Sequence, residues 1–106
     1  MKNFLVSLLL VCSTAQAQYQ SGNELYADLT SSSPQSKMYA LGYIVGVTDA
    51  VLNIVVCINP GVTQGQLQDV VKNYLFANPQ NRDIPANYLV VAALGQHWPC
   101  KDRKKS

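Results

Sequence analysis

The sequence is poor in the side chains from which enzymes build reactive centres. His97 is the only histidine among 106 residues, and only 13% of the residues are charged. The chain has neither a G-x-x-x-x-G-K phosphate loop nor a G-x-S-x-G nucleophile elbow. The sequence therefore predicts no catalytic residue and no cofactor, and a non-enzymatic role.

The body of the chain also lacks the concentrated positive charge of a nucleic-acid-binding protein. Residues 18–100 carry three basic side chains against five acidic ones, whereas residues 101–106 carry four basic against one acidic. Affinity for a nucleic-acid backbone needs several phosphate contacts made together. We therefore expect no nucleic-acid partner, and we interpret residues 101–106 as a basic, disordered tail.

No apolar run has the character of a membrane span. The first, at residues 4–11, is far shorter than the roughly 20 residues that a bilayer requires. The second, at residues 41–58, carries Asp49 near its centre, and a carboxylate there costs roughly 3 kcal/mol in lipid. The sequence predicts no membrane span.

The first apolar run instead belongs to a predicted secretory signal peptide, residues 1–17. Lys2 supplies the positive charge at its start, and Ala-Gln-Ala at 15–17 is a typical cleavage site. Cys12 follows Val11 rather than a small residue, which argues against a lipoprotein. The expected mature chain therefore begins near Gln18 and lies in the periplasm.

Cysteine is scarce, and loss of Cys12 with the signal leaves only Cys57 and Cys100. Such a pair in an oxidising compartment is expected to form a disulfide. The bridge would close a loop of about 43 residues and stabilise the fold by roughly 4 kcal/mol. A metal half-site is the alternative, but zinc needs about four ligands and the chain has no C-x-x-C pair. We expect no bound metal.

Four helix signals alternate with polar or proline-containing breaks. Ser21-x-x-Glu24 and Thr63-x-x-Gln66 are capping boxes, which mark helix starts. We expect helices over residues 22–29, 35–56, 64–77 and 86–98. The fold class is therefore all-α: residues 18–100 form one compact domain of four to five helices, stapled by a Cys57–Cys100 disulfide.

The long second helix is expected to be central and packed on several sides, because its apolar residues cover most of its circumference. Gly42 and Gly46 lie four residues apart and form a smooth notch that another backbone can approach. Asp49 continues this ridge. It is interpreted as a buried carboxylate satisfied by a backbone N–H or by Thr48; the alternative is a polar anchor at a partner interface.

The last helix has an apolar stripe on which His97 is expected to lie, partly buried beside Trp98, in a structural role rather than a catalytic one. The inner stripe is predicted to consist of Ala86, Leu89, Val90, Ala93, Leu94 and His97. The six tyrosines exceed what so small a core needs. Tyrosine is enriched at protein interfaces, so the composition favours a protein partner.

Four segments in order carry a recognisable pattern. They are Gly42-Tyr43-Ile44-Val45-Gly46-Val47-x-Asp49-Ala50, Cys57-Ile58-x-Pro60 with its following capping box and helix, Asn78-Pro79 with the last helix, and Trp98-Pro99-Cys100. Together they resemble the Rap/Tai family, periplasmic immunity proteins of the type VI secretion system that bind and block peptidoglycan amidases. In that pattern Gly42, Tyr43, Gly46, Asp49, Pro60 and Pro99 are structural positions.

The resemblance implies an all-α fold, a homodimer and an amidase as the partner. Members usually carry two further cysteines, at positions that correspond to Leu29 and Ala40 here, as expected if packing replaces a second disulfide. Partner contacts are expected in two exposed loops, residues 59–62 and 78–83. The candidate contact residues are Asn59, Gly61, Asn78, Gln80, Asn81, Arg82 and Asp83.

Two other functions stay open at this point. One is a periplasmic accessory domain that binds an envelope protein and has no toxin partner. The other is a small enzyme, whose turnover would depend on Asp49 or His97.

Overall fold

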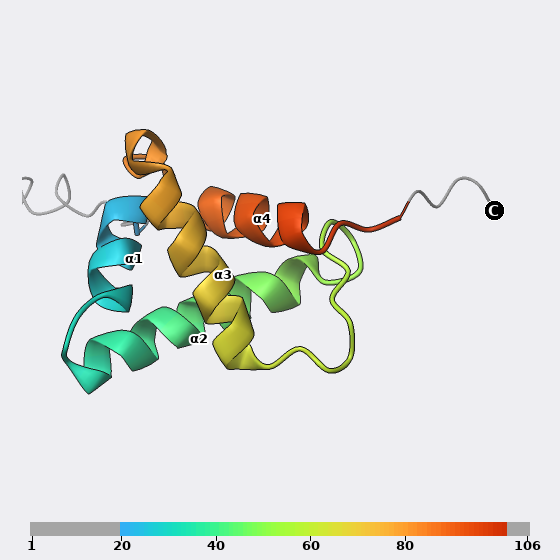
Figure 1. Ribbon diagram of the computed structural model, residues 1–106, viewed down its shortest axis with the longest axis horizontal. Coiled ribbons are helices and arrows are strands. Elements are labelled where there is room, and N and C mark those ends of the chain that lie inside the picture. The colour runs from blue at the N-terminus through green and yellow to red at the C-terminus, as the bar shows by residue number, and fades with distance from the viewer. Residues whose placement is uncertain (1–19, 102–106) are drawn as a thin grey trace, which may run out of the picture.

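The computed structural model describes residues 20–101. The predicted signal peptide, its cleavage site and tail residues 102–106 lie outside this range. The described chain is all-α, as predicted, and contains no strand. Its elements are α1 (Gly22–Leu29), α2 (Pro34–Val51), α3 (Gln64–Ala77), the short 3₁₀ helix η3 (Pro79–Asn81) and α4 (Ala86–His97) (Figure 1).

Both predicted capping boxes are formed. The Ser21 hydroxyl accepts a hydrogen bond from the Glu24 backbone N–H at 3.1 Å, and the Glu24 carboxylate accepts one from the Ser21 N–H at 2.9 Å. Thr63 and Gln66 repeat this exchange at 3.1 and 2.8 Å. These reciprocal bonds satisfy N–H groups that a helix start otherwise leaves unpaired, and they explain why α1 and α3 begin where the sequence indicates.

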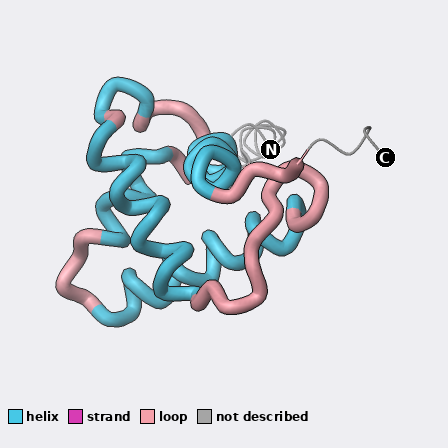
Figure 2. The backbone as a smooth tube through the Cα atoms, turned by 45° about the vertical axis from the view of Figure 1, so that its right-hand side comes forward, coloured by secondary structure: helices cyan, strands magenta, loops and turns pink. Residues whose placement is uncertain are grey.

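The second helix ends at Val51, five residues before the predicted end at Val56. Asn53 adopts a left-handed conformation with φ of 65°, which a helix interior does not allow. The chain then turns back, and the Cys57 N–H donates to the Trp98 carbonyl at 2.9 Å. A turn over residues 52–56, whose Ile54 and Val55 N–H groups donate to the Val51 carbonyl, therefore takes the place of the last turn and a half of the expected helix (Figure 2).

The core lies between the four helices, each of which packs against the other three. In Figure 1, α3 runs across α2 and α4, and α1 closes one end. The predicted stripe of α4 is buried except for His97, which is exposed. That part of the prediction is wrong because His97 is the last residue of α4, beyond the part of the stripe that other helices cover.

The prediction that α2 is packed on several sides is confirmed only in part, because the helix contacts α1, α3 and α4 but leaves one face exposed. Its buried residues are only Ala40, Ile44 and Thr48, which share one face. Gly42 and Gly46 face open space, and a Cβ added at either glycine would meet no packing neighbour within 4 Å. The smooth notch therefore lies on the surface of this chain and is not filled by another of its helices.

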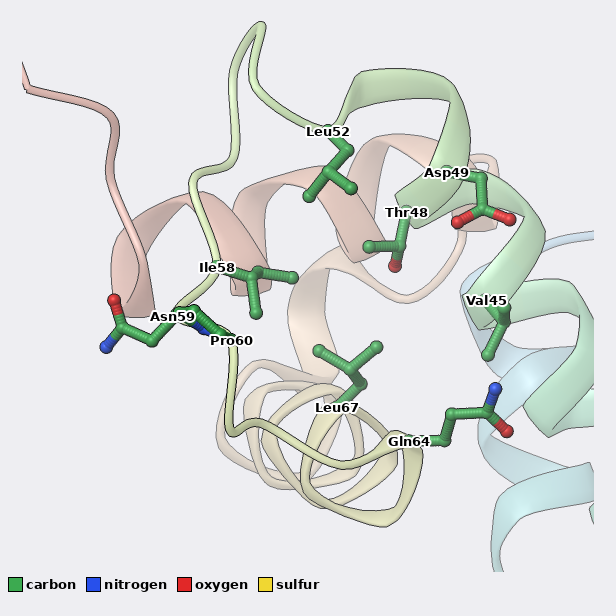
Figure 3. Close-up of a pocket in the computed structure, with 9 residues that line it drawn as sticks. All are labelled: Val45, Thr48, Asp49, Leu52, Ile58, Asn59, Pro60, Gln64 and Leu67. Carbon is green, nitrogen blue, oxygen red and sulfur yellow. The ribbon is translucent and has the colours of Figure 1, made fainter.

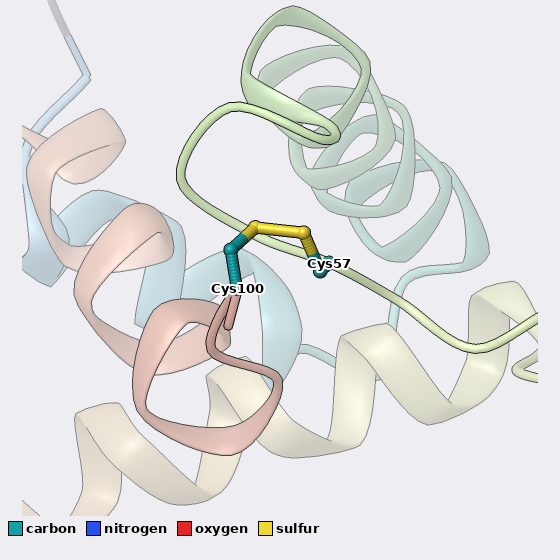
Figure 4. Close-up of a disulfide and its surroundings, with 2 residues drawn as sticks. All are labelled: Cys57 and Cys100. Carbon is teal, nitrogen blue, oxygen red and sulfur yellow. A yellow bond between two sulfur atoms is a disulfide. The ribbon is translucent and has the colours of Figure 1, made fainter. Parts of the chain in front are cut away.

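Leu29 and Ala40, the positions where relatives were expected to carry cysteines, are buried in the core, with exposed fractions of 3% and 0%. Both are apolar core residues, as expected if packing replaces a second disulfide. The expected Cys57–Cys100 disulfide is present, with a Cα–Cα distance of 4.8 Å (Figure 4). It joins the segment after α2 to the end of the chain after α4, and so fixes the start of the loop that leads to α3.

Candidate protein-binding site

The two loops predicted to contact a partner lie at opposite ends of α3 (Figure 1). This helix has 14 residues, which corresponds to a length of about 21 Å. The loops therefore do not form one continuous surface, and each has to be judged by its own surroundings.

Loop 78–83 is largely held by the rest of the fold. The Arg82 side-chain Nε–H donates to the Leu75 carbonyl at 2.7 Å, and its guanidinium lies 4.1 Å from the centre of the Tyr26 ring. The Asn23 N–H donates to the Arg82 carbonyl at 2.7 Å, and the Asn78 side chain donates to the Tyr74 carbonyl at 2.8 Å. Within this loop Pro79, Gln80 and Asp83 are exposed, whereas Asn78, Asn81 and Arg82 are half-buried.

Loop 59–62 has few internal contacts. Its Asn59, Pro60 and Gly61 are exposed. A single backbone bond from the Val62 N–H to the Asn59 carbonyl, at 3.2 Å, closes the turn, and the Asn59 side chain makes no hydrogen bond within residues 20–101. The side chains of this loop are therefore available to a partner, while the Cys57 disulfide anchors its base.

This loop forms one wall of a groove of about 290 Å³ whose opposite wall is the C-terminal part of α2 (Figure 3). Leu52, Ile58 and Leu67 converge on its floor, and Asp49, Asn59 and Gln64 supply polar groups around it. The full lining consists of Val45, Thr48, Asp49, Leu52, Ile58, Asn59, Pro60, Gln64 and Leu67. An apolar floor with a few polar groups at the edge is typical of a binding site.

The structure corrects the first interpretation of Asp49. The residue is exposed, and its side chain makes no hydrogen bond or ion pair with residues 20–101. Its neighbour Thr48 is the buried polar residue, and the Thr48 hydroxyl donates to the Ile44 carbonyl at 2.7 Å rather than serving Asp49. Of the two interpretations, the buried carboxylate is wrong, and an anchor for a partner stays a hypothesis.

An exposed apolar turn next to the groove was missed by the sequence reasoning. Leu52, Ile54 and Val55 are 38%, 72% and 45% exposed. The expected helix would have run through these residues and hidden the turn. The available signal was Asn53, the residue type that most readily adopts φ above 0 after glycine, set just before a run of β-branched residues.

A second exposed surface consists of tyrosines from α2 and α4. Tyr39 and Tyr88 are 60% and 63% exposed, and Tyr43 lines a hollow together with Tyr88. Burial, reinforced by the nearby Tyr39, raises the pKa of Tyr43 above 10.0, with the Asn87 backbone acting in the opposite direction. The Tyr43 hydroxyl is thus a neutral hydrogen-bonding group at neutral pH.

The described residues show where His97 lies and whether they hold a metal-binding group or a membrane-spanning helix. His97 lies on the surface with its ring centre 4.4 Å from that of Trp98, in an edge arrangement. Within residues 20–101 no group of three or more His, Cys, Asp or Glu side chains is placed to hold a metal ion. In the same range no helix is both long and apolar enough to cross a membrane.

Comparison with known proteins adds one match. The model of a family described as Rap1a immunity proteins matches residues 9–100. No curated protein matches the chain. The matched range includes all four helices, the disulfide and the groove.

Proposed function

Because the chain belongs to the Rap1a immunity protein family, we propose that it binds a peptidoglycan amidase in the periplasm and blocks the active site of that enzyme. The family implies a protein partner, namely a secreted effector. The amidase, the periplasm and the mode of inhibition are our proposal. We further propose that the contact lies at one end of the molecule. We call this surface the groove end, and it consists of turn 52–55, loop 59–62 and the groove beside them.

The exposed apolar turn is the observation that carries this proposal. Apolar side chains as exposed as Ile54 and Val55, gathered beside a groove, mark an interaction surface more often than a solvated one. Aliphatic side chains on a projecting turn can fill an enzyme cleft and exclude its substrate. Inhibition of this kind needs no reactive group.

The groove end is also held in place before binding. The disulfide joins Cys57 to Cys100, and the Cys57 N–H donates to the Trp98 carbonyl, so the segment between turn and loop is tied to the end of α4. A surface ordered in advance loses less conformational entropy on binding. This favours tight one-to-one binding without turnover.

The test is a pull-down of the mature protein, residues 18–106, with candidate type VI amidases, followed by a peptidoglycan hydrolysis assay of each captured enzyme. We expect one amidase to be captured and silenced. Ile54→Asp should weaken inhibition at least tenfold, because it places a charge in the apolar contact. Phe76→Asp is the matched control, since Phe76 is 68% exposed but lies on α3 outside the groove end.

The outcomes separate the alternatives. Equal loss of inhibition in both variants, or loss only in the Phe76 variant, would place the contact elsewhere. Capture of amidases without inhibition, or no capture at all, would contradict the immunity role and favour the envelope-accessory function. Mass spectrometry of the periplasmic fraction checks the compartment, with the mature N-terminus expected near Gln18.

We further propose that the homodimer implied by the family resemblance uses the outward ridge of α2. Met38 and Tyr39 are 66% and 60% exposed, and Gly42 and Gly46 continue the ridge with open space above them. The two glycines would allow a second helix to approach closely, and Met38 and Tyr39 would supply apolar contacts beside them. Gly46→Leu should convert a dimer to a monomer in light scattering without loss of helix content, and a dimer that tolerates this change would contradict the assignment.

A further inference from the structure

The groove holds a carboxylate in an electrostatically unfavourable place. Asp49 lies two residues before the end of α2 at Val51, and the last turn of this helix contains no basic residue. The C-terminus of a helix carries the negative end of its dipole, so a carboxylate there is destabilising and a cation is stabilising. A positive group arriving at this point would interact favourably with both the carboxylate and the helix end.

The segment of this chain that lines the groove contains no positively charged side chain to supply that group. The sequence contains no Lys, Arg or His between Lys37 and Lys72, a stretch that includes every residue lining the groove. Asp49 forms no ion pair within residues 20–101. Its negative charge is therefore uncompensated at the edge of an apolar groove.

We propose that this groove receives an arginine side chain from an exposed segment of the partner protein. The inference rests on the proposed function, because it names the chemistry by which the groove end recognises its partner. The aliphatic part of the arginine lies against Leu52, Ile58 and Leu67, and the guanidinium pairs with the Asp49 carboxylate. The amide side chain of Gln64 lies on the same side of the groove as Asp49 and offers a further oxygen acceptor (Figure 3).

Chemistry favours arginine over other ligands. A groove of about 290 Å³ has room for one long side chain. Arginine combines an apolar stem with a charged head, and its planar guanidinium matches a carboxylate with two parallel hydrogen bonds. Lysine lacks that geometry.

The first experiment uses peptides, so that it does not depend on the identity of the amidase. Mature protein, residues 18–106, is titrated with the blocked peptide acetyl-Ala-Leu-Arg-Ala-amide and with the same peptide carrying neutral citrulline in place of arginine. Backbone amide shifts are followed by NMR. We expect saturable shifts at Asp49, Leu52 and Gln64 with the arginine peptide, and binding about tenfold weaker with citrulline.

Two variants test the carboxylate. Asp49→Asn should weaken binding of the arginine peptide about tenfold, while its melting temperature stays equal or rises, because the change removes a negative charge from the helix end. Asp69→Asn is the matched control, since Asp69 is also exposed but lies on α3 outside the groove lining. Shifts that are scattered, or insensitive to Asp49→Asn, would overturn the proposal.

The basic tail of this chain is the rival occupant of the groove. If removal of residues 102–106 shifts the same groove amides in the absence of peptide, the tail fills the groove and the proposal is overturned.

The amidase assay distinguishes failure of the arginine site from failure of the immunity function. Inhibition that is strong in the wild type and unchanged in Asp49→Asn would refute the arginine site and leave the immunity function standing. If no amidase is inhibited, the immunity function fails and the peptide titration still decides the arginine site.

Discussion

The two loops that flank α3 start with the same dipeptide, Asn59-Pro60 and Asn78-Pro79, but the fold treats them differently. Loop 78–83 lies against α1, where its backbone and Arg82 are bound. Loop 59–62 projects beside the groove, and Asn59 and Pro60 are exposed. Proline restricts the preceding residue equally in both loops, so local sequence does not account for the contrast.

The contrast comes from what packs next to each loop. At one end of α3, backbone N–H groups at the start of α1 bind the loop and the residue after it. The Asn23 N–H donates to the Arg82 carbonyl at 2.7 Å, and the Gly22 N–H donates to the Ile84 carbonyl at 2.9 Å. At the other end, the disulfide holds only the base of the loop. One loop is thus part of the scaffold, and the other is a surface that the scaffold presents.

The largest expected effect comes from removing the bridge that anchors the presented loop. Replacing Cys57 and Cys100 together by alanine should lower the free energy of unfolding by about 4 kcal/mol, since the bridge closes a long loop in the unfolded chain. Urea denaturation measures the change, and reduction of the wild type serves as the control. Inhibition of the partner should weaken as well, because the groove end loses its anchor. A loss below about 1 kcal/mol would contradict this role of the bridge.

Arg82→Gln tests the scaffold loop. It removes the bond to Leu75 and the stacking on Tyr26, which together are worth about 2–3 kcal/mol. Urea denaturation should show this loss, while the affinity of the folded fraction for the partner stays within twofold. Unchanged stability with lost inhibition would instead assign partner binding to loop 78–83, and this loop would then not be part of the scaffold.

Gly22→Ala probes the contact between α1 and the scaffold loop. An added Cβ would lie 2.9 Å from the Arg82 carbonyl oxygen and against the Leu89 side chain, so the loop must shift, at a cost of about 1–3 kcal/mol. Gly95→Ala is the control: Gly95 faces open space in α4, and alanine there should stabilise the helix by up to about 1 kcal/mol. The melting temperature should fall in Gly22→Ala and rise in the control variant, relative to the wild type. Similar melting temperatures in the two variants would refute this packing argument.

Local signals in the sequence predicted most of the scaffold. The capping boxes at Ser21 and Thr63 place helix starts because their bonds span three residues, and the apolar stripe of α4 predicts its buried face as far as Leu94. The disulfide could be predicted because exclusion of Cys12 left one pair of cysteines. These features depend on near neighbours or on composition.

The groove end, in contrast, could not be predicted from local signals. Beyond Val51 the chain leaves the helix at Asn53, with φ of 65°. It then pairs with the segment after α4 through the bond from Cys57 to Trp98 and the disulfide, which join segments far apart in the chain. The early end of α2 puts Ile54 and Val55 on an exposed turn, next to the groove at Asp49. The error in α2 and the missed turn therefore have the same cause. The contact residues proposed in the two loops remain predictions.

The smallest expected effects come from the same substitution made in both dipeptides. Asn78→Ala removes the side-chain bond to the Tyr74 carbonyl near the end of α3 and should cost about 1 kcal/mol. Asn59→Ala removes no internal side-chain bond and should change stability by less than about 0.5 kcal/mol. Partner inhibition should follow the opposite order, because the Asn59 side chain is available to a partner and that of Asn78 is already bound. Paired urea denaturation and inhibition assays measure both quantities. If Asn59→Ala lowers stability as much as Asn78→Ala does, loop 59–62 also belongs to the scaffold.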